Sequence, residues 1–368
     1  MTRVIYFTRD YTTHDHRFLS KLAQTEHQIY YLQLERRGHS LEDRPLPPQI
    51  ECINWAGGKQ PVSWRDGLHL LVDLKRIIRQ VKPDLIQAGP IQRSALLVAL
   101  SGFQPLVSMS WGYDLLIDAE RSALWRWVTR YTLKHSAAMV GDCDTIRRIA
   151  VAHGMPDKRI VTFPWGIDLQ HFSPGQPPAS SDQPSTFVIL STRGWEPIYG
   201  VDVIARAFAI AAAQRPELRL IMLGNGSQAA QLRQIFLSAR VEDHVLFPGQ
   251  VGHHDLPRYY RMADLYLSAS HSDGTSISLL EAMACGRPVL VSDIPGNREW
   301  VQPGINGWLF PDGDEKALAE SILKAVEKRQ RLPDMGRRAR QIAEQRADWE
   351  KNFPILLRAY EVALNSFI

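Results

Sequence analysis

Short apolar stretches alternate with longer amphipathic stretches along most of the chain. In the first half, apolar runs typical of buried strands occupy residues 3–8, 28–34, 83–87 and 105–110. One stretch between them has helical spacing, residues 67–81, with apolar positions at Leu68, Leu71, Leu74, Ile78 and Val81. Strands that alternate with helices are typical of a doubly wound, parallel α/β domain. We therefore predict an α/β fold whose ligands gather at the carboxyl ends of the strands.

The second half repeats this alternation after a boundary that is visible in the composition. Residues 176–185 are rich in Pro and Ser, which is typical of a linker. Further strands are predicted at residues 187–191, 219–223, 265–269 and 289–292. We predict one domain over residues 1–175, a second over residues 176–345, and a C-terminal helical segment over residues 346–368.

The most informative stretch begins where a predicted strand ends. It reads Ser268-Ala-Ser-His-Ser-Asp-Gly-Thr-Ser-Ile-Ser-Leu-Leu-Glu-Ala-Met-Ala-Cys-Gly-Arg-Pro288. A polar loop with Asp273 precedes a helical stretch that Gly286 ends. The first N–H groups of a helix and the positive end of its dipole suit a phosphate, although Ser and Thr there can also cap the helix. We expect an anion site here, which Asp273 and Glu281 cannot both face.

This stretch resembles the donor-binding motif of the retaining glycosyltransferases of family 4, which have the GT-B fold. In that motif two Glu residues flank seven others, and Ala-Met-Ala-x-Gly-x-Pro-Val follows the second. The tail here reads Glu281-Ala-Met-Ala-Cys-Gly-Arg-Pro-Val289, and Asp273 stands at the position of the first Glu. The resemblance implies two Rossmann-like doubly wound domains that face each other across a cleft. It also implies that residues 346–368 cross back to the N-terminal domain.

Other segments of the second domain resemble the same family. Arg193 follows a predicted strand, at the position of an Arg that holds the leaving diphosphate. Tyr199 stands where the family usually has Lys. Gly224 matches the family's Gly-x-Gly turn, and the segment with Gly249 and Val251 resembles the one whose backbone contacts the nucleotide base.

The resemblance implies transfer of a sugar from a UDP- or GDP-sugar to a hydroxyl acceptor, with retention of the anomeric configuration. Three residues are then the catalytic candidates: Arg193 for the leaving diphosphate, Glu281 for the ribose, and Asp273 for a hydroxyl of the donor sugar. The candidate donor-binding residues are Gly224, Gly249, Val251, Gly274, Thr275, Ser276, Ile277 and Ser278. Neither a metal nor a cofactor is expected, and the nucleotide diphosphate sugar is a co-substrate.

The candidate acceptor residues come from the N-terminal domain. The family's Gly-rich first loop is absent, and the loop predicted there carries His14 and His16 before a helix that starts at Arg17. Trp111 and Asp114 follow a later strand, where many members carry a His. Asp114 can orient an acceptor hydroxyl or cap the next helix. The acceptor can be a glycan, a lipid-linked glycan or a small molecule.

Composition narrows the class of protein. With 45% hydrophobic and 22% charged residues, the chain resembles a soluble globular protein. Three widely spaced cysteines suggest neither a disulfide framework nor a zinc site: Cys52, Cys143 and Cys285. No apolar run approaches the roughly 18 residues of a membrane helix, and no signal-peptide pattern opens the chain. We therefore expect a cytoplasmic protein.

The excess of positive over negative residues lies in the first half of the chain. Residues 1–175 hold 22 Lys and Arg against 17 Asp and Glu, a balance of +5, which leaves 21 against 22 in the rest. No nucleic-acid motif accompanies this charge, so nucleic acid is not an expected partner. Residues 121–135 place basic and aromatic side chains at helical spacing. This pattern favours a helix packed through its aromatic side, and peripheral contact of the N-terminal domain with the inner face of a membrane is the second hypothesis.

Two other functions stay open beside the glycosyltransferase. One is a nucleotide-sugar hydrolase or epimerase of the GT-B fold, against which the family 4 motifs argue. The other is a degenerate, non-catalytic protein that binds a nucleotide sugar. Asp273, Tyr199 and the Gly-poor first loop are the departures that favour the degenerate protein.

Overall fold

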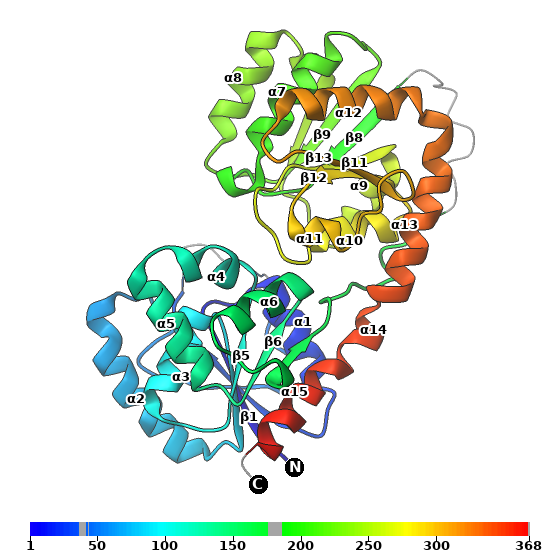
Figure 1. Cartoon of the computed structure of the whole chain (residues 1–368). Coiled ribbons are helices and arrows are strands. Elements are labelled where there is room, and N and C mark those ends of the chain that lie inside the picture. Colours follow the sequence, from blue (N-terminus) through cyan, green and yellow to red (C-terminus); the bar gives the residue numbers. More distant parts are fainter. Residues whose placement is uncertain (37–41, 43, 176–185, 367–368) are drawn as a thin grey trace. The chain divides into compact units, whose positions relative to one another are not determined.

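The computed structural model describes residues 1–36, 42, 44–175 and 186–366. The chain forms two compact units (Figure 1): unit 1 comprises Met1–Phe163 and Phe353–Ile368, and unit 2 comprises Pro164–Asn352. The chain passes from unit 1 to unit 2 after Phe163 and returns to unit 1 after Asn352, whereas the sequence predicted domain boundaries after residues 175 and 345. The predicted linker at residues 176–185 lies outside the described residues.

Unit 1 is built on a seven-stranded parallel sheet in the order β3-β2-β1-β4-β5-β6-β7. The strands are β1 (Arg3–Thr8), β2 (Gln28–Gln33), β3 (Glu51–Cys52), β4 (Leu85–Ala88), β5 (Leu106–Met109), β6 (Ala138–Gly141) and β7 (Ile160–Thr162). Chain order reverses between β1 and β4, which pair through Val4 and Leu85. Ligands of doubly wound sheets bind beside such a reversal, at the carboxyl ends of the strands.

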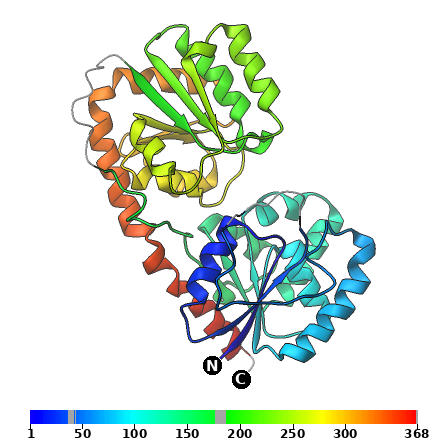
Figure 2. The same cartoon turned by 180° about the vertical axis from the view of Figure 1, so that it is seen from behind.

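Helices cover both faces of this sheet. They are α1 (Thr13–Leu22), α2 (Gly67–Val81), α3 (Leu96–Ser101), α4 (Tyr113–Leu116), α5 (Ala123–Lys134), α6 (Asp144–Ala152) and α15 (Pro354–Asn365). α2, α3 and α5 lie on one face, and α1 and α15 lie on the other (Figures 1 and 2). The last helix of the chain thus completes the N-terminal unit.

Three local predictions for unit 1 need correction. The first helix begins at Thr13 rather than Arg17, because Thr12 and Asp15 form a capping box, so His14 and His16 are helical. The apolar face predicted for α2 is displaced, since the helix buries Leu70, Leu74 and Ile77. The C-terminal segment is interrupted at Phe353 and begins a new helix at Pro354, whose missing N–H favours a helix start.

Unit 2 contains a six-stranded parallel sheet in the order β10-β9-β8-β11-β12-β13. Its strands are β8 (Phe187–Ser191), β9 (Leu218–Leu223), β10 (Val245–Gly249), β11 (Leu265–Ser268), β12 (Val289–Ser292) and β13 (Gly307–Phe310). The helices are α7 (Val201–Ala212), α8 (Ala229–Ala239), α9 (Leu256–Met262), α10 (Ile277–Ala284), α11 (Pro295–Arg298), α12 (Glu315–Glu327), α13 (Leu332–Arg346) and α14 (Trp349–Asn352). Chain order reverses between β8 and β11, which pair through Ile189 and Leu265.

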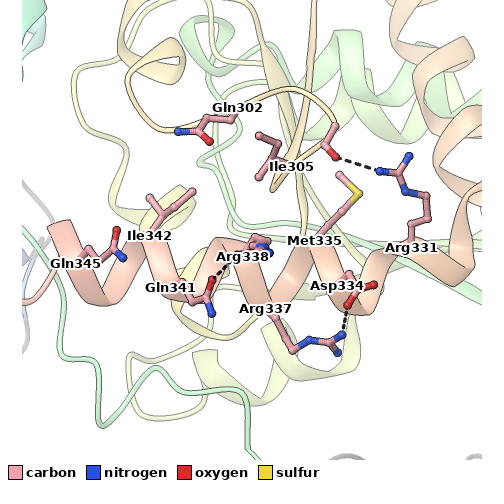
Figure 3. Close-up of a pocket in the computed structure, with 11 residues that line it drawn as sticks. Gln302, Ile305, Arg331, Asp334, Met335, Arg337, Arg338, Gln341, Ile342 and Gln345 are labelled. Carbon is pink, nitrogen blue, oxygen red and sulfur yellow. Dashed lines mark hydrogen bonds and ion pairs between the residues drawn. The ribbon is translucent and has the colours of Figure 1, made fainter.

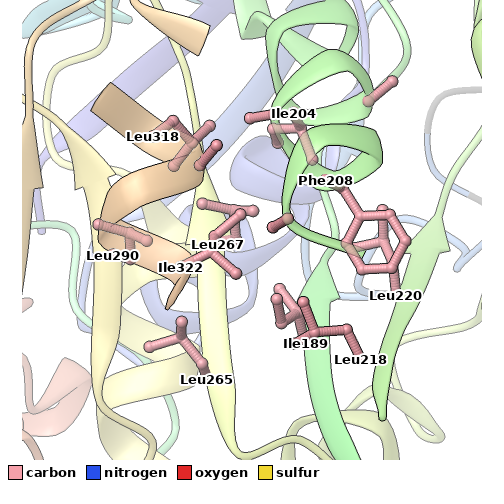
Figure 4. Close-up of a cluster of buried hydrophobic side chains, with 14 of the residues drawn as sticks. Ile189, Ile204, Phe208, Leu218, Leu220, Leu265, Leu267, Leu290, Leu318 and Ile322 are labelled. Atoms are coloured by element: carbon pink, nitrogen blue, oxygen red, sulfur yellow. The ribbon is translucent and has the colours of Figure 1, made fainter. Parts of the chain in front are cut away.

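The core of unit 2 fixes the ends of these strands. Figure 4 shows side chains of the sheet facing α7 and α12, among them Ile189, Leu220, Leu267 and Leu290 from the strands and Ile204, Phe208, Leu318 and Ile322 from the helices. On the other face, α10 buries Leu279, Leu280 and Met283. Because α10 also packs on α13, its N-terminus is held where β8 and β11 end.

Candidate functional site

The strongest candidate site lies at the β8–β11 reversal of unit 2. Arg193, directly after β8, reaches the loop that joins β11 to α10. Its Nη2 atom is 2.8 Å from Oδ2 of Asp273. Its Nη1 atom donates to Oγ of Ser276 at 2.9 Å and to Oγ of Ser278 at 3.1 Å. Two segments separated by about eighty residues thus place one guanidinium at the start of α10.

The start of α10 has a guanidinium beside it and no side-chain cap. Ser276 is the N-cap residue, yet its side chain makes no capping hydrogen bond. Its Oγ accepts from Arg193 instead. Backbone N–H groups in the first turn and a guanidinium beside them form a positive region that suits phosphate oxygens. Gly274 and Thr275 are buried in the preceding loop, and Ile277 is the first helical residue.

Glu281 belongs to the same polar network but has a different partner. It is buried in α10, and its Oε2 accepts from the Tyr260 hydroxyl at 2.8 Å. The Tyr260 hydroxyl also lies 3.1 Å from Oγ1 of Thr192, the neighbour of Arg193. Burial, followed by the Glu281 charge, raises the pKa of Tyr260 well above its ordinary value. Tyr260 therefore keeps its proton and serves as a donor to Glu281.

The glycine predicted in the Gly-x-Gly turn lies directly against Arg193. Gly224 has a φ of +103°, and a Cβ there would be 3.0 Å from the carbonyl oxygen of Arg193. Its N–H donates to the carbonyl of Gly249 at 2.8 Å, which ties the ends of β9 and β10 together. Val251 is half-buried and packs against the core beyond that point. The structure thus brings most of the candidate donor residues to neighbouring strand ends.

Two acceptor candidates lie together in unit 1. The rings of His14, in the first turn of α1, and Trp111, after β5, have centroids 5.7 Å apart. Phe18 adds an edge-on contact to Trp111 at 6.0 Å. His14 and Trp111 therefore form one polar-aromatic surface at the carboxyl end of the sheet.

The other two acceptor candidates have separate surroundings. Nδ1 of His16 is 2.7 Å from the Tyr11 hydroxyl, and burial together with the charge of Arg44 lowers the pKa of His16. Asp114 is buried, and its Oδ1 accepts from the Ser110 hydroxyl at 2.6 Å. Burial outweighs its hydrogen bonds and raises the pKa of Asp114 to about 6.

The Asp114 carboxylate organises the backbone around it. Its Oδ1 accepts from the N–H groups of Trp111 and Leu115, each at 3.1 Å. Its Oδ2 accepts from the N–H of Ile91 at 3.0 Å. These contacts hold the loops after β4 and β5 in place, and Asp114 itself lies in the first turn of α4 (Tyr113–Leu116), whose N-cap residue is Gly112.

Sequence reasoning did not identify the tyrosines around the candidate donor site. Tyr260 on α9, Tyr266 on β11 and Tyr199 after β8 all touch it. The Tyr266 hydroxyl donates to Oγ of Ser278 at 2.7 Å. In the sequence, Tyr260 and Tyr266 are indistinguishable from core aromatics. Only Tyr199 could be singled out from the sequence, because the family usually has Lys at that position.

Three other features of the structure concern metal binding, membrane-spanning helices and cavities. Among the described residues, no group of three or more His, Cys, Asp or Glu side chains could hold a metal ion. No helix in the described part of the chain is both long and apolar enough to cross a bilayer. A cavity of about 850 Å³ lies elsewhere in unit 2, between α13 and the Gln302–Ile305 loop (Figure 3). None of the predicted site residues lines it.

Comparison with known protein families shows to which family of enzymes the chain belongs. The model for glycosyltransferase family 4 matches residues 12–171, and the model for glycosyl transferases group 1 matches residues 177–342. The chain belongs to the family 4, group 1 glycosyltransferases. The predicted family membership is therefore confirmed for both halves of this glycosyltransferase.

Relatives in this glycosyltransferase family are similar over part of their length. The D-inositol 3-phosphate glycosyltransferase of Saccharomonospora viridis is 27% identical over 239 residues, which cover 61% of this chain and 55% of that protein. The corresponding protein of Geodermatophilus obscurus is 29% identical over 233 residues, covering 60% and 51%. The chain thus spans about half the length of the curated relatives it matches.

A solved structure extends the similarity to the fold of the whole glycosyltransferase chain. The Anabaena protein Alr3699/HepE, solved in complex with UDP and glucose, has a TM-score of 0.78 at 18% identity, covering 98% of this chain and 100% of that one. At this identity the likeness concerns the fold. Together with the two parallel Rossmann-like sheets, it confirms the predicted α/β GT-B fold.

Proposed function

We propose that this glycosyltransferase moves a sugar from a nucleotide diphosphate sugar to a hydroxyl acceptor, with retained anomeric configuration and without a bound metal. One observation carries the proposal: a guanidinium, that of Arg193, lies at the uncapped start of α10. A departing diphosphate gains negative charge, and fixed positive groups around it lower the barrier. The donor we favour is a UDP- or GDP-sugar, and the UDP bound in the HepE structure supports the former.

The carboxylates of Asp273 and Glu281 are proposed to bind different parts of the donor. Asp273 pairs with Arg193 through Oδ2, and we assign its Oδ1 to a hydroxyl of the donor sugar. Glu281 accepts from Tyr260 through Oε2, and we assign its carboxylate to the ribose hydroxyls. Because Asp is shorter than the Glu of the family motif, the sugar would have to approach Asp273 more closely.

The transfer step needs no protein nucleophile in this scheme. The bond between the anomeric carbon and the phosphate oxygen breaks, and the acceptor oxygen bonds to the anomeric carbon on the same face. The acceptor proton passes to the departing phosphate oxygen, which becomes more basic as it leaves. Arg193 and the first N–H groups of α10 would stabilise the remaining charge. The surface formed by His14 and Trp111 is the proposed place for the acceptor, which is a glycan, a lipid-linked glycan or a small molecule.

A product assay tests this function against its alternatives. The chain is incubated in EDTA with UDP-glucose or GDP-mannose and a panel of hydroxyl acceptors, and the anomer of the product is assigned by NMR. We expect a product with the anomeric configuration of the donor. An inverted product contradicts the retaining mechanism, and free sugar without transfer indicates a hydrolase. Binding of the donor without turnover indicates a degenerate protein, and activity that appears only with added metal contradicts metal independence.

The proposal includes a membrane as a partner of unit 1. Large apolar side chains are exposed on two helices of one sheet face: Leu68 and Val72 on α2 are 80% and 69% exposed, and Leu124 and Trp127 on α5 are 59% and 56% exposed. Monomeric proteins seldom expose several large apolar side chains together, and such patches often mark an interaction surface. α3 packs against both helices and lies between them (Figure 1).

Basic side chains follow the apolar ones on each helix. On α2, Leu68 and Val72 share a row with Lys75 and Arg79, because residues three or four apart are neighbours on a helix. On α5, Arg130 and Lys134 follow the apolar pair in the same way. α2 and α5 both precede a strand of the parallel sheet, so they run in the same direction and their apolar halves lie at the same end. An apolar band beside a basic band suits an anionic lipid surface.

Vesicle co-sedimentation tests this partner. We expect the chain to bind vesicles that contain phosphatidylglycerol more strongly than neutral vesicles, and Trp127→Ser or Lys134→Glu to weaken that binding. Leu237→Ser on α8 is the matched control, because Leu237 is 57% exposed in unit 2. Equal binding by Trp127→Ser and the wild type contradicts the proposal. Self-association that Trp127→Ser removes would assign the surface to a second copy of the chain instead.

We also place the reaction in the cytoplasm, at the inner face of the membrane. No disulfide joins Cys52, Cys143 and Cys285, which suits a reducing compartment. Fractionation of cells that express the tagged chain checks this location, and recovery outside the cytoplasm contradicts it.

A further inference from the structure

The residue at the position of the family's Lys lies directly against the remaining cation. The guanidinium carbon of Arg193 is 4.1 Å from the centroid of the Tyr199 ring. A guanidinium over the face of an aromatic ring is attracted by the ring's negative face. Tyr199 therefore contacts the arginine on which the proposed donor site is centred, at the position where the family has Lys.

The backbone fixes the position of this ring. Tyr199 ends a short turn, Pro197–Tyr199, and its N–H donates to the carbonyl of Glu196 at 2.9 Å. The next residue back, Ile198, accepts from the N–H of His271 at 2.9 Å. This hydrogen bond ties the turn to the loop that follows β11 and carries Asp273. The ring and the carboxylate that hold Arg193 are thus positioned by one connected piece of backbone.

Gly200 makes the close approach of the two segments possible. Its φ is +57°, and a Cβ there would lie 2.1 Å from the carbonyl oxygen of Ala269. No side chain fits that space without moving the backbone. This contact therefore fixes the backbone from which the Tyr199 side chain reaches Arg193.

The surroundings restrict Arg193 on several sides at once. The Tyr199 ring covers one face of its guanidinium, while Asp273, Ser276 and Ser278 engage its nitrogens. A guanidinium binds phosphate best when its planar fork is presented in a fixed orientation. A second cation beside Arg193 would add charge but would cover neither face of that plane.

We infer that Tyr199 is a positioning residue, which sets the plane of Arg193 so that a single arginine holds the diphosphate in place of an Arg–Lys pair. This inference rests on the proposed function, because it concerns the same donor site. The aromatic ring is the part that acts, and the hydroxyl is dispensable. The site thereby combines one oriented cation with the N–H groups at the start of α10.

Titration calorimetry with UDP, and with GDP in parallel, tests the inference in EDTA. We expect Tyr199→Leu to raise the Kd for the nucleotide that the wild type binds by roughly 3- to 30-fold. Tyr199→Phe keeps the ring and is expected to bind as the wild type does. The Arg193→Lys background keeps the charge but lacks the planar group, so there Tyr199→Leu should change the Kd less than about 2-fold. Melting temperatures of all variants show that each is folded at the assay temperature.

The outcomes separate this inference from the proposed function. A Tyr199→Leu chain that binds the nucleotide as the wild type does overturns the positioning role. So does an equal loss in the Arg193 and Arg193→Lys backgrounds, which indicates a general structural effect, or a loss in Tyr199→Phe, which assigns the effect to the hydroxyl. A wild-type chain that binds neither UDP nor GDP overturns the proposed function, and this inference with it.

Discussion

Replacing Arg193 by Ala removes the charge that the proposed donor site would offer to a diphosphate. At about 4 Å and an effective dielectric constant of about 20, one pair of unit charges is worth about 4 kcal/mol. Only the charge that grows in the transition state lowers the barrier, yet the ground-state contact is lost as well. We therefore expect kcat/KM to fall about 1000-fold in the Arg193→Ala variant.

The same substitution leaves the Asp273 carboxylate without its ion-pair partner. The side chains of Arg193 and Asp273 are 12% and 20% exposed. Breaking a buried pair costs about 3–5 kcal/mol, and solvent screening at this exposure reduces the loss to about 1–3 kcal/mol. The melting temperature of a unit of this size should fall by about 2–10 °C.

Three variants separate the two effects, with steady-state transfer of sugar and differential scanning calorimetry as the assays. Arg206→Ala is the matched control, because Arg206 on α7 is ion-paired to Asp202 at 2.8 Å in the same unit. It should lose stability and keep its kcat/KM. The double variant Arg193→Ala, Asp273→Asn should recover the melting temperature but not the activity. A kcat/KM of Arg193→Ala within about 10-fold of the wild type refutes the assignment of Arg193 to the leaving diphosphate.

Three further changes test the framework by thermal or denaturant unfolding. Gly200→Ala is expected to cost about 1–3 kcal/mol, because its Cβ would meet the carbonyl of Ala269 at 2.1 Å; an unchanged melting temperature contradicts this. Thr12→Ala removes the cap of α1 and should cost about 1 kcal/mol, whereas no loss would show that the Asp15 side chain holds the helix start alone. The pKa of Asp114 is raised to about 6, so the folded state binds this proton more tightly than the unfolded state does. The free energy of unfolding that protonation of Asp114 contributes therefore declines as pH rises from about 4 to about 6. Asp114→Asn should lack this component of the pH dependence, and parallel curves for the two chains would contradict the raised pKa.

The fold could be predicted because its evidence is local and repeated. Strand-like runs alternate with helical spacing, and the motif that ends in Glu281 is specific to one family. The pairing of Arg193 with Ser276 and Ser278 also follows from topology, since both segments end at the carboxyl ends of neighbouring strands.

The remaining features depend on tertiary contacts. Helical spacing placed Leu68 on the buried face of α2, yet Leu70 is buried and Leu68 is exposed, because Leu68 and Val72 form a second apolar row on the exposed side of this helix. The role of Tyr199 could not be predicted, since the contact of its ring with Arg193 depends on a turn held by backbone hydrogen bonds. The early start of α1 was visible in the Thr-x-x-Asp capping pattern at Thr12 and was missed.

The most direct test of the central claim is a thermal-shift titration with UDP-, GDP- and ADP-sugars in EDTA. A ligand present at about 100 times its Kd adds roughly 2.7 kcal/mol of stability to the state it binds. We expect one nucleotide series to raise the melting temperature of the wild type and to leave that of Arg193→Ala unchanged. The absence of a shift with every series, or a shift that Arg193→Ala retains in full, would contradict the assignment of the donor site to Arg193 and the start of α10.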